Sequence, residues 1–270
     1  MIYMLEKELS NFERQFKEFL TPDIDEYLQK FVFAKSKRLR PILGILFLKT
    51  LGFEVEEQHR NLFFAVELIH SASLLHDDII DNAETRRGIK TVNFEYGNSL
   101  AVSSGDLLLA LAMKQILQIE NKDVQNMCVS EMAKICHGEI SQFFSKYKTP
   151  TLEEYIEKSR QKTALLFKIS ITGAIMISKQ NNLFELASTF AENFGIAFQI
   201  KNDLDNFISK KEDYQQGVYT APVIFGGKMA LEKTKDLINN YIEICTGLIK
   251  NLPENDYKYA ILELVNQVKE

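Results

Sequence analysis

Apolar residues recur at intervals of three and four along most of this chain, which is the spacing of one face of an α-helix. The clearest stretch covers residues 62–74, and similar stretches at 242–249 and 261–268 lie near the end of the chain. The strict alternation of a β-strand is almost absent. The five prolines and twelve glycines fall mainly where these stretches begin or stop. The pattern therefore predicts an all-α fold.

Two of the predicted helices, residues 38–51 and 163–178, are apolar around more than half of their circumference. Helices of this kind belong inside a bundle, where they can pack in the core or line an apolar cavity. No Gly/Ser linker, repeat or low-complexity stretch divides the chain. We expect residues 1–270 to form a single-domain bundle of about ten helices around a deep central cavity.

Composition and charge narrow the class of protein. The chain is 46% hydrophobic and 26% charged, which is typical of a soluble globular protein, and its net charge of −5 argues against a general nucleic-acid surface. The three cysteines form no CxxC pair and are expected to be reduced core thiols. No signal peptide or transmembrane segment is evident, because the apolar runs are too short. These features predict a cytoplasmic protein.

Three aspartates close one of the apolar helical stretches. At helical spacing Asp77 and Asp81 share a face, about 6 Å apart along the axis, and Asp78 lies beside them. Carboxylates this close repel one another unless a hard cation lies between them. Mg²⁺ takes one or two protein carboxylates and fills its other positions with water and phosphate oxygens. Since Arg86 and Arg87 follow directly, the segment predicts a site for a Mg²⁺-bound diphosphate.

Four further polar segments occur at predicted helix ends. Residues 36–41 carry three cations at a helix start, where an anion binds well. Lys162 and Thr163 open an apolar helix, residues 198–207 end another with a second acidic cluster, and residues 213–224 join a turn to a helix. Any one of these segments alone is more typical of a solvated helix end. Five of them in one chain indicate a binding site.

In this order, from about Lys37 to Val223, the segments resemble those of the trans-isoprenyl diphosphate synthases, the polyprenyl synthetase family. The resemblance implies the isoprenoid synthase fold, in which two aspartate-rich motifs face each other across a cavity mouth and hold two or three Mg²⁺ ions. It also implies the reaction of an allylic diphosphate with isopentenyl diphosphate, joined head to tail, and a homodimer.

The resemblance assigns roles by position. Asp77 and Asp81 are expected to bind Mg²⁺, with Asp78 in support, and Arg86 to hold the allylic diphosphate. Four residues are expected to hold isopentenyl diphosphate: Lys37, Arg40, His70 and Arg87. Four more are expected around the reacting end of the allylic substrate: Lys162, Thr163, Gln199 and Lys201. Since His70 lies two turns before Asp77 on the same face, ligand contact is favoured over a buried structural role.

The second acidic motif departs from the family pattern. The family has DDxxD, whereas this chain reads Asn202-Asp203-Leu204-Asp205-Asn206. Asn202 and Asp203 are expected to bind the third metal, more weakly because an amide oxygen is a poorer Mg²⁺ ligand than a carboxylate. Lys210 and Lys211 are the candidates for a lysine that the family often places after this motif.

Small residues before the first motif predict a long product. Ala72 and Ser73 lie five and four positions before Asp77, where short-chain members carry a bulky aromatic residue. The expected product is a polyprenyl diphosphate longer than C15. Phe143, with Phe144, is a candidate for the cavity floor, and equally for plain core packing.

Several alternatives remain at this point. They are a short-chain farnesyl or geranylgeranyl diphosphate synthase, a class I terpene cyclase, and a subunit of a heteromeric prenyl synthase with weakened activity. Lys210 stands where the cyclase pattern has an acid, and cyclases need no isopentenyl site. A helical scaffold protein would not explain the ordered motifs.

Overall fold

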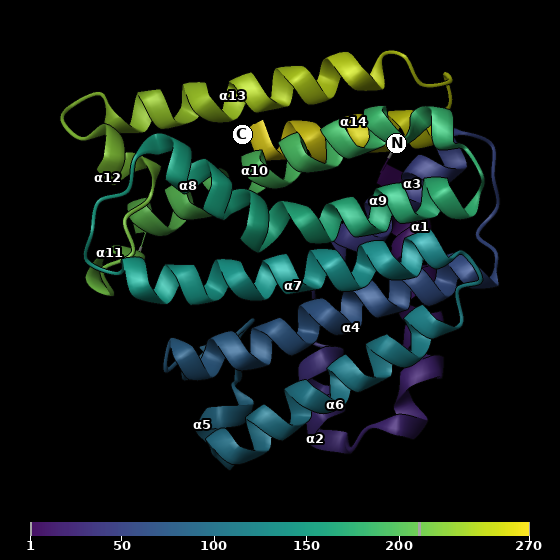
Figure 1. Cartoon of the computed structure of the whole chain (residues 1–270), viewed down its shortest axis with the longest axis horizontal. Helices are drawn as coiled ribbons and strands as arrows, with labels where there is room; N and C mark the ends of the chain where they lie inside the picture. The colour runs from purple at the N-terminus through teal and green to yellow at the C-terminus, as the bar shows by residue number, and fades with distance from the viewer. Residues whose placement is uncertain (1, 210–211, 270) are drawn as a thin grey trace.

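The computed structural model of the chain describes residues 2–209 and 212–269. Over these residues the fold is built from α-helices, so the all-α prediction is confirmed (Figure 1). The helices are α1 (Ile2–Leu20), α2 (Glu26–Val32), α3 (Leu39–Thr50), α4 (Glu57–Ile80), α5 (Val92–Tyr96), α6 (Asn98–Leu117), α7 (Lys122–Ser145), α8 (Leu152–Ser159), α9 (Leu165–Ile177), α10 (Phe184–Ser209), α11 (Glu212–Gln215), α12 (Ala221–Phe225), α13 (Ala230–Ile249) and α14 (Asp256–Lys269). The number of helices among the described residues exceeds the ten or so that we expected, because several short helices lie in the connections.

Irregular elements join some of these helices. Short 3₁₀ turns occupy Thr21–Asp23 and Asn181–Leu183, and a π-helical turn, Arg160–Ala164, separates α8 from α9. In the part of the chain that the structure describes, strands are limited to β1 (Thr85–Arg86) and β2 (Ile89–Lys90), which pair antiparallel directly after α4.

Helices α3 and α9 form the centre of the bundle, as their apolar circumference predicts. Nearly every residue of both is buried, and α9 packs against α3, α4, α7 and α10. The crossing of α3 and α9 is close: a Cβ atom at Gly44 would lie 2.5 Å from the Ser170 hydroxyl. One hydrophobic cluster joins buried residues from Phe12 to Val268.

Helix α6 is long and apolar enough, by length and composition, to cross a membrane. Core helices of soluble bundles also meet this test. Here α6 packs along α4, and its inner face is buried at Ala101, Leu108 and Ala112. The packing accounts for the apolar residues of this inner face.

The polar motifs gather at one end of the bundle. The C-terminal ends of α4, α7 and α10 and the start of α9 all lie toward the left of Figure 1. Alternating helix direction produces this arrangement, since α9 runs opposite to its neighbours α7 and α10. Segments far apart in sequence therefore meet at this end.

Candidate active site

The first acidic motif occupies the last turn of α4 and its C-terminal cap. Asp78 is buried, 1% exposed, and its Oδ1 accepts a hydrogen bond from Arg86 Nε over 2.6 Å. The β1–β2 hairpin brings Arg86 back to the helix end, and its turn has positive φ at Arg87 and Gly88 (53° and 79°). Asp78 thus positions Arg86. Three carboxylates at a helix C-terminus also oppose the helix dipole, which favours a bound cation there.

Asp77 lies in a partly buried, charged setting. Burial raises its pKa to about 6, and the charges of Glu139 and Asp81 add to the rise, while Lys162 and Arg86 oppose it. Burial lowers the pKa of Lys162, but Asp77 and Glu139 outweigh this effect and raise it. Lys162 Nζ is 3.1 Å from Glu139 Oε1. A lysine between two carboxylates is firmly charged at neutral pH.

The donors at this end of α4 suit a divalent metal. Asp78 Oδ2 is buried without a hydrogen-bond partner, and Asp77 and Asp81 repel each other. Within residues 2–209 and 212–269, however, no group of three or more His, Cys, Asp or Glu side chains is arranged to hold a metal ion. An ion here would take one or two carboxylates and complete its shell with water and phosphate oxygens, which is the habit of Mg²⁺.

A basic pocket of about 320 Å³ lies beside this motif. It is lined from four separate segments: the start of α3, the middle of α4, the β1–β2 hairpin and the end of α10. Its ionisable residues include the predicted isopentenyl set and a few others, namely Lys37, Arg38, Arg40, Glu67, His70, Arg86 and Arg87. Among the described residues that line the pocket, Glu67 is the one acid. The excess of positive charge fits an anion such as a diphosphate.

Arg38 is bound inside the protein. Its side chain is 2% exposed, donates to Glu67 Oε1 over 2.5 Å and to the Val32 carbonyl over 2.6 Å, and its backbone is left-handed (φ 45°). Arg38 therefore holds the loop before α3 in place. This leaves Lys37, which is exposed, and Arg40 as the cations of this segment that can reach a ligand.

Arg40 and His70 differ in charge. Arg40 lies over the Phe167 ring (5.1 Å to its centre), and burial lowers its pKa to about 10, so it remains charged at pH 7. Burial and the charges of Arg40 and Arg87 lower the pKa of His70 well below its ordinary value. His70 is neutral at pH 7 and can donate one N–H to a phosphate oxygen.

A hydrogen-bond chain links the π-helical turn before α9 to α10 and α8. Thr163 Oγ1 donates to Gln199 Oε1 (2.5 Å), Gln199 Nε2 donates to Asp203 Oδ1 (2.7 Å), and the Tyr155 hydroxyl donates to Asp203 Oδ2 (2.7 Å). Lys162 lines the same hollow of about 120 Å³. The predicted grouping of Lys162, Thr163 and Gln199 is therefore present in the structure.

The structure does not bring Asn202 and Asp203 into one ligand set. Asn202 lines the basic pocket, whereas Asp203 is 8% exposed and faces Tyr155 and Gln199. Successive residues on a helix point about 100° apart, which separates them. Lys201, expected at the reacting end, pairs with Asp205 over 2.8 Å at a more exposed edge. Lys210 and Lys211 lie outside the described residues.

The residues predicted to set product length have different surroundings. Ala72 is fully buried, and Ser73 is half-buried with its hydroxyl donating to the His70 carbonyl over 2.9 Å. Both alternatives given for Phe143, the cavity floor and plain core packing, are wrong, because Phe143 and Phe144 are 64% and 73% exposed. They lie one turn beyond Glu139, at the mouth end of α7.

Sequence reasoning missed three residues of this site: Glu67, Glu139 and Tyr155. Each is a polar residue in an otherwise ordinary helical stretch. Glu67 and Glu139 lie on the α4 and α7 faces that turn toward the motifs, so a helical projection of those segments could have marked them. Tyr155 carries no comparable signal, since its partner is 48 residues away.

Comparison with known proteins identifies the family. The Polyprenyl synthetase family matches residues 21–253. A prenyl transferase of Cyanophora paradoxa is 30% identical, over 88% of this chain and 86% of that protein. The decaprenyl-diphosphate synthase of Dictyostelium discoideum is 34% identical over 78% of this chain, which spans about half (48%) of that longer protein. The chain belongs to the polyprenyl synthetase family and is a prenyltransferase.

The solved structures agree on the fold. The heptaprenyl diphosphate synthase of Staphylococcus aureus superposes with a TM-score of 0.91, covering 98% of both chains, at 22% identity. At this identity the likeness concerns the fold.

Proposed function

We propose that this enzyme joins isopentenyl diphosphate head to tail to an allylic diphosphate and releases a polyprenyl diphosphate longer than C15. One observation carries the proposal: two separate anion-binding places open at the same end of the bundle. One is the basic pocket around Arg40 and His70. The other is proposed around Lys162, which lines a separate hollow of about 120 Å³ and whose pKa is raised by the charge of Asp77. A condensation of two diphosphates needs both, whereas a cyclase needs one.

The basic pocket suits isopentenyl diphosphate. Lys37, Arg40 and Arg87 supply charge, and neutral His70 supplies a hydrogen-bond donor. Arg40 is held by the Phe167 ring and Arg38 is occupied by Glu67, so the pocket is formed before the ligand arrives. A preorganised site loses little conformational entropy on binding.

The allylic diphosphate is proposed to lie between α4 and the start of α9. Mg²⁺ held by Asp77 and Asp81 would neutralise the charge that develops on the diphosphate as the allylic C–O bond breaks. Lys162 supplies a fixed positive charge on the other side, and Thr163 and Gln199 orient the reacting end. Arg86, positioned by Asp78, holds the diphosphate.

The remaining chemistry needs no nucleophilic side chain. The isopentenyl double bond attacks the allylic cation, a new C–C bond forms, and the departing diphosphate takes the proton that is lost. Apolar walls from α4 and α9 keep water from the cation. The small side chain of the half-buried Ser73 is proposed to border the growing tail along α4.

A homodimer is part of the proposal. Helices α6 and α7 present large apolar side chains to solvent at Val102, Leu107, Val129 and Ile140, which are 40–55% exposed. Exposed apolar positions on adjacent long helices are typical of a subunit interface.

Product analysis tests the proposal. The purified chain is incubated with Mg²⁺, radiolabelled isopentenyl diphosphate and each of three primers, the C5, C10 and C15 allylic diphosphates. We expect labelled products longer than C15 that require both substrates, and none from an Asp77→Ala control. A cyclic product formed without isopentenyl diphosphate would indicate a cyclase. No turnover by the chain alone would indicate a subunit that needs a second, different chain.

A further inference from the structure

The π-helical turn Arg160–Ala164, called here the π-turn, carries Lys162 and Thr163. Its closing bond runs from the Leu165 amide to the Arg160 carbonyl, one residue wider than in an α-helix. π-Turns are rare, and they occur often at functional sites. Because this backbone is less favourable than a continuous α-helix, neighbouring elements have to hold it.

Two neighbouring helices touch the π-turn closely. A Cβ atom at Gly195 of α10 would lie 2.4 Å from Ala164 Cα, and one at Gly138 of α7 would lie 3.0 Å from Gln161 Cβ. These contacts limit the movement of the π-turn toward α7 and α10. They do not fix its two ends along the helix axis.

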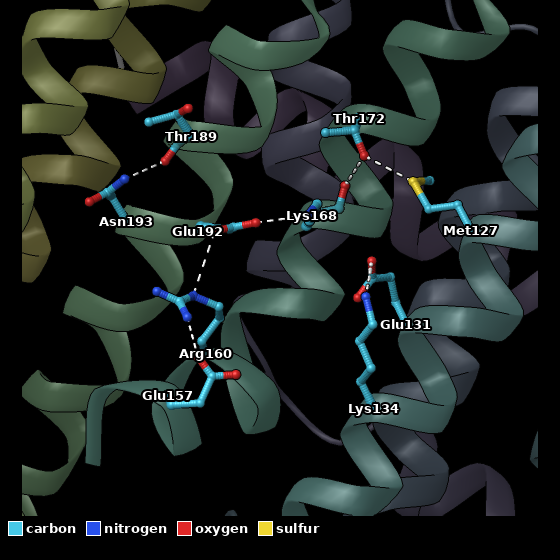
Figure 2. A network of polar contacts seen from close by, with 10 residues as sticks. All are labelled: Met127, Glu131, Lys134, Glu157, Arg160, Lys168, Thr172, Thr189, Glu192 and Asn193. Atoms are coloured by element: carbon cyan, nitrogen blue, oxygen red, sulfur yellow. Dashed lines mark hydrogen bonds and ion pairs between the residues drawn. The ribbon is translucent and has the colours of Figure 1, made fainter. Parts of the chain in front are cut away.

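A carboxylate on α10 spans the π-turn. Glu192 Oε1 lies 2.7 Å from Lys168 Nζ, and its Oε2 lies 3.6 Å from Arg160 Nε. Arg160 is the first residue of the π-turn, and Lys168 lies in the first turn of α9 beyond it. Figure 2 shows Glu192 between these two cations, with Arg160 also reaching Glu157 of α8.

The two ion pairs of Glu192 are partly shielded from water. The side chains of Lys168, Glu192 and Arg160 are 18%, 27% and 37% exposed. Arg160 Nε is buried and has no hydrogen-bond partner, and the Glu192 carboxylate is its ion-pair partner, while Nη1 of the same guanidinium pairs with Glu157. Without that carboxylate, Lys168 loses its 2.7 Å ion pair and Arg160 keeps only its pair with Glu157 of α8. The link from α10 to both sides of the π-turn is then lost, and the π-turn is freer to shift.

We propose that Glu192 is a positioning residue of this enzyme. It contacts no substrate and acts through Arg160 and Lys168, holding the two ends of the π-turn so that the Lys162 ammonium and Thr163 hydroxyl point at the allylic site. The inference rests on the roles given to Lys162 and Thr163 under the proposed function.

A kinetic comparison is the first half of the test. Glu192→Gln keeps the size of the side chain and removes its charge. The matched control is Glu8→Gln, which breaks the ion pair of Glu8 with Lys49, also 2.7 Å long but on α1 and α3, away from the π-turn. We expect Glu192→Gln to lower kcat about tenfold and to leave KM for isopentenyl diphosphate within about twofold, while Glu8→Gln changes only stability.

Amide hydrogen exchange is the second half. In Glu192→Gln we expect the peptide covering residues 160–168 to exchange about tenfold faster than in the unmodified protein, with no such change in Glu8→Gln. Unchanged exchange, or faster exchange with an unchanged kcat, overturns the positioning role. If the unmodified enzyme itself turns over no substrate, the proposed function fails, while the exchange experiment still tests whether Glu192 holds the π-turn.

Discussion

A buried hydrogen bond of 2.7 Å joins the Tyr155 hydroxyl on α8 to the Asp203 carboxylate on α10. Asp203 directly follows Asn202, where the second acidic motif differs from the family pattern. Burial raises the pKa of Tyr155 well above its ordinary value, and the Asp203 charge and hydrogen bond add to the rise. Tyr155 therefore stays protonated and remains a donor. Asp203 uses its other oxygen for Gln199, so it links Tyr155 of α8 to Gln199 through hydrogen bonds.

Tyr155→Phe should weaken this arrangement. The substitution leaves Asp203 Oδ2 buried without that donor, at a cost of about 1–3 kcal/mol. We expect a lower midpoint of thermal unfolding and a lower kcat, because Asp203, the hydrogen-bond partner of Gln199, is held less firmly. Tyr259→Phe, which removes an exposed hydroxyl contact with Glu254, should leave both unchanged. Equal effects of the two substitutions would contradict the role of Tyr155.

The buried pair of Arg38 and Glu67 should be strongly coupled. Removing either partner leaves an uncompensated buried charge, so Arg38→Gln and Glu67→Gln should each cost about 3 kcal/mol of unfolding free energy. The double variant should lose less than the sum, by about 1–3 kcal/mol. Chemical denaturation of the four proteins measures this coupling. Additive losses would mean that the pair does not hold the loop before α3.

Asp77 should destabilise the metal-free protein at neutral pH. Its folded-state pKa of about 6 lies above the ordinary 3.8, so the folded protein holds this proton more tightly than the unfolded chain does. The favourable contribution of protonated Asp77 to the free energy of unfolding is therefore fully present below pH 3.8, and it is lost as the pH rises through about 6. Asp77→Asn should raise the thermal midpoint by roughly 2–6 °C at pH 7.5 without metal. The gain should vanish near pH 4, and activity should be lost.

Product length should respond to Ser73. Ala72 is fully buried, so a tyrosine there would overpack the α4 interface. Its effect on stability could then not be separated from an effect on product length. Ser73 is half-buried. We expect Ser73→Phe to shorten the product distribution, measured by chromatography of the dephosphorylated products. Phe144→Ala, at an exposed position, is the control that should not change it. An unchanged product from Ser73→Phe would place the tail elsewhere.

The sequence alone determined the helices and the motifs. A three- and four-residue repeat of apolar side chains defines a helical face wherever it occurs, so α4, α9 and α13 could be predicted without any tertiary information. The first motif and the basic segment at residues 36–41 could also be read locally, because their charges are neighbours in the chain.

Tertiary structure decided which charges face each other. Arg38 meets Glu67 from 29 positions away, Lys162 meets Glu139 from 23, and Tyr155 meets Asp203 from 48. Helical periodicity fixes a residue's face but not the element packed against that face, which is why Phe143 was misplaced and the π-turn was not foreseen. Asn202 and Asp203 are adjacent in sequence, yet the geometry of one helix sends them to different pockets.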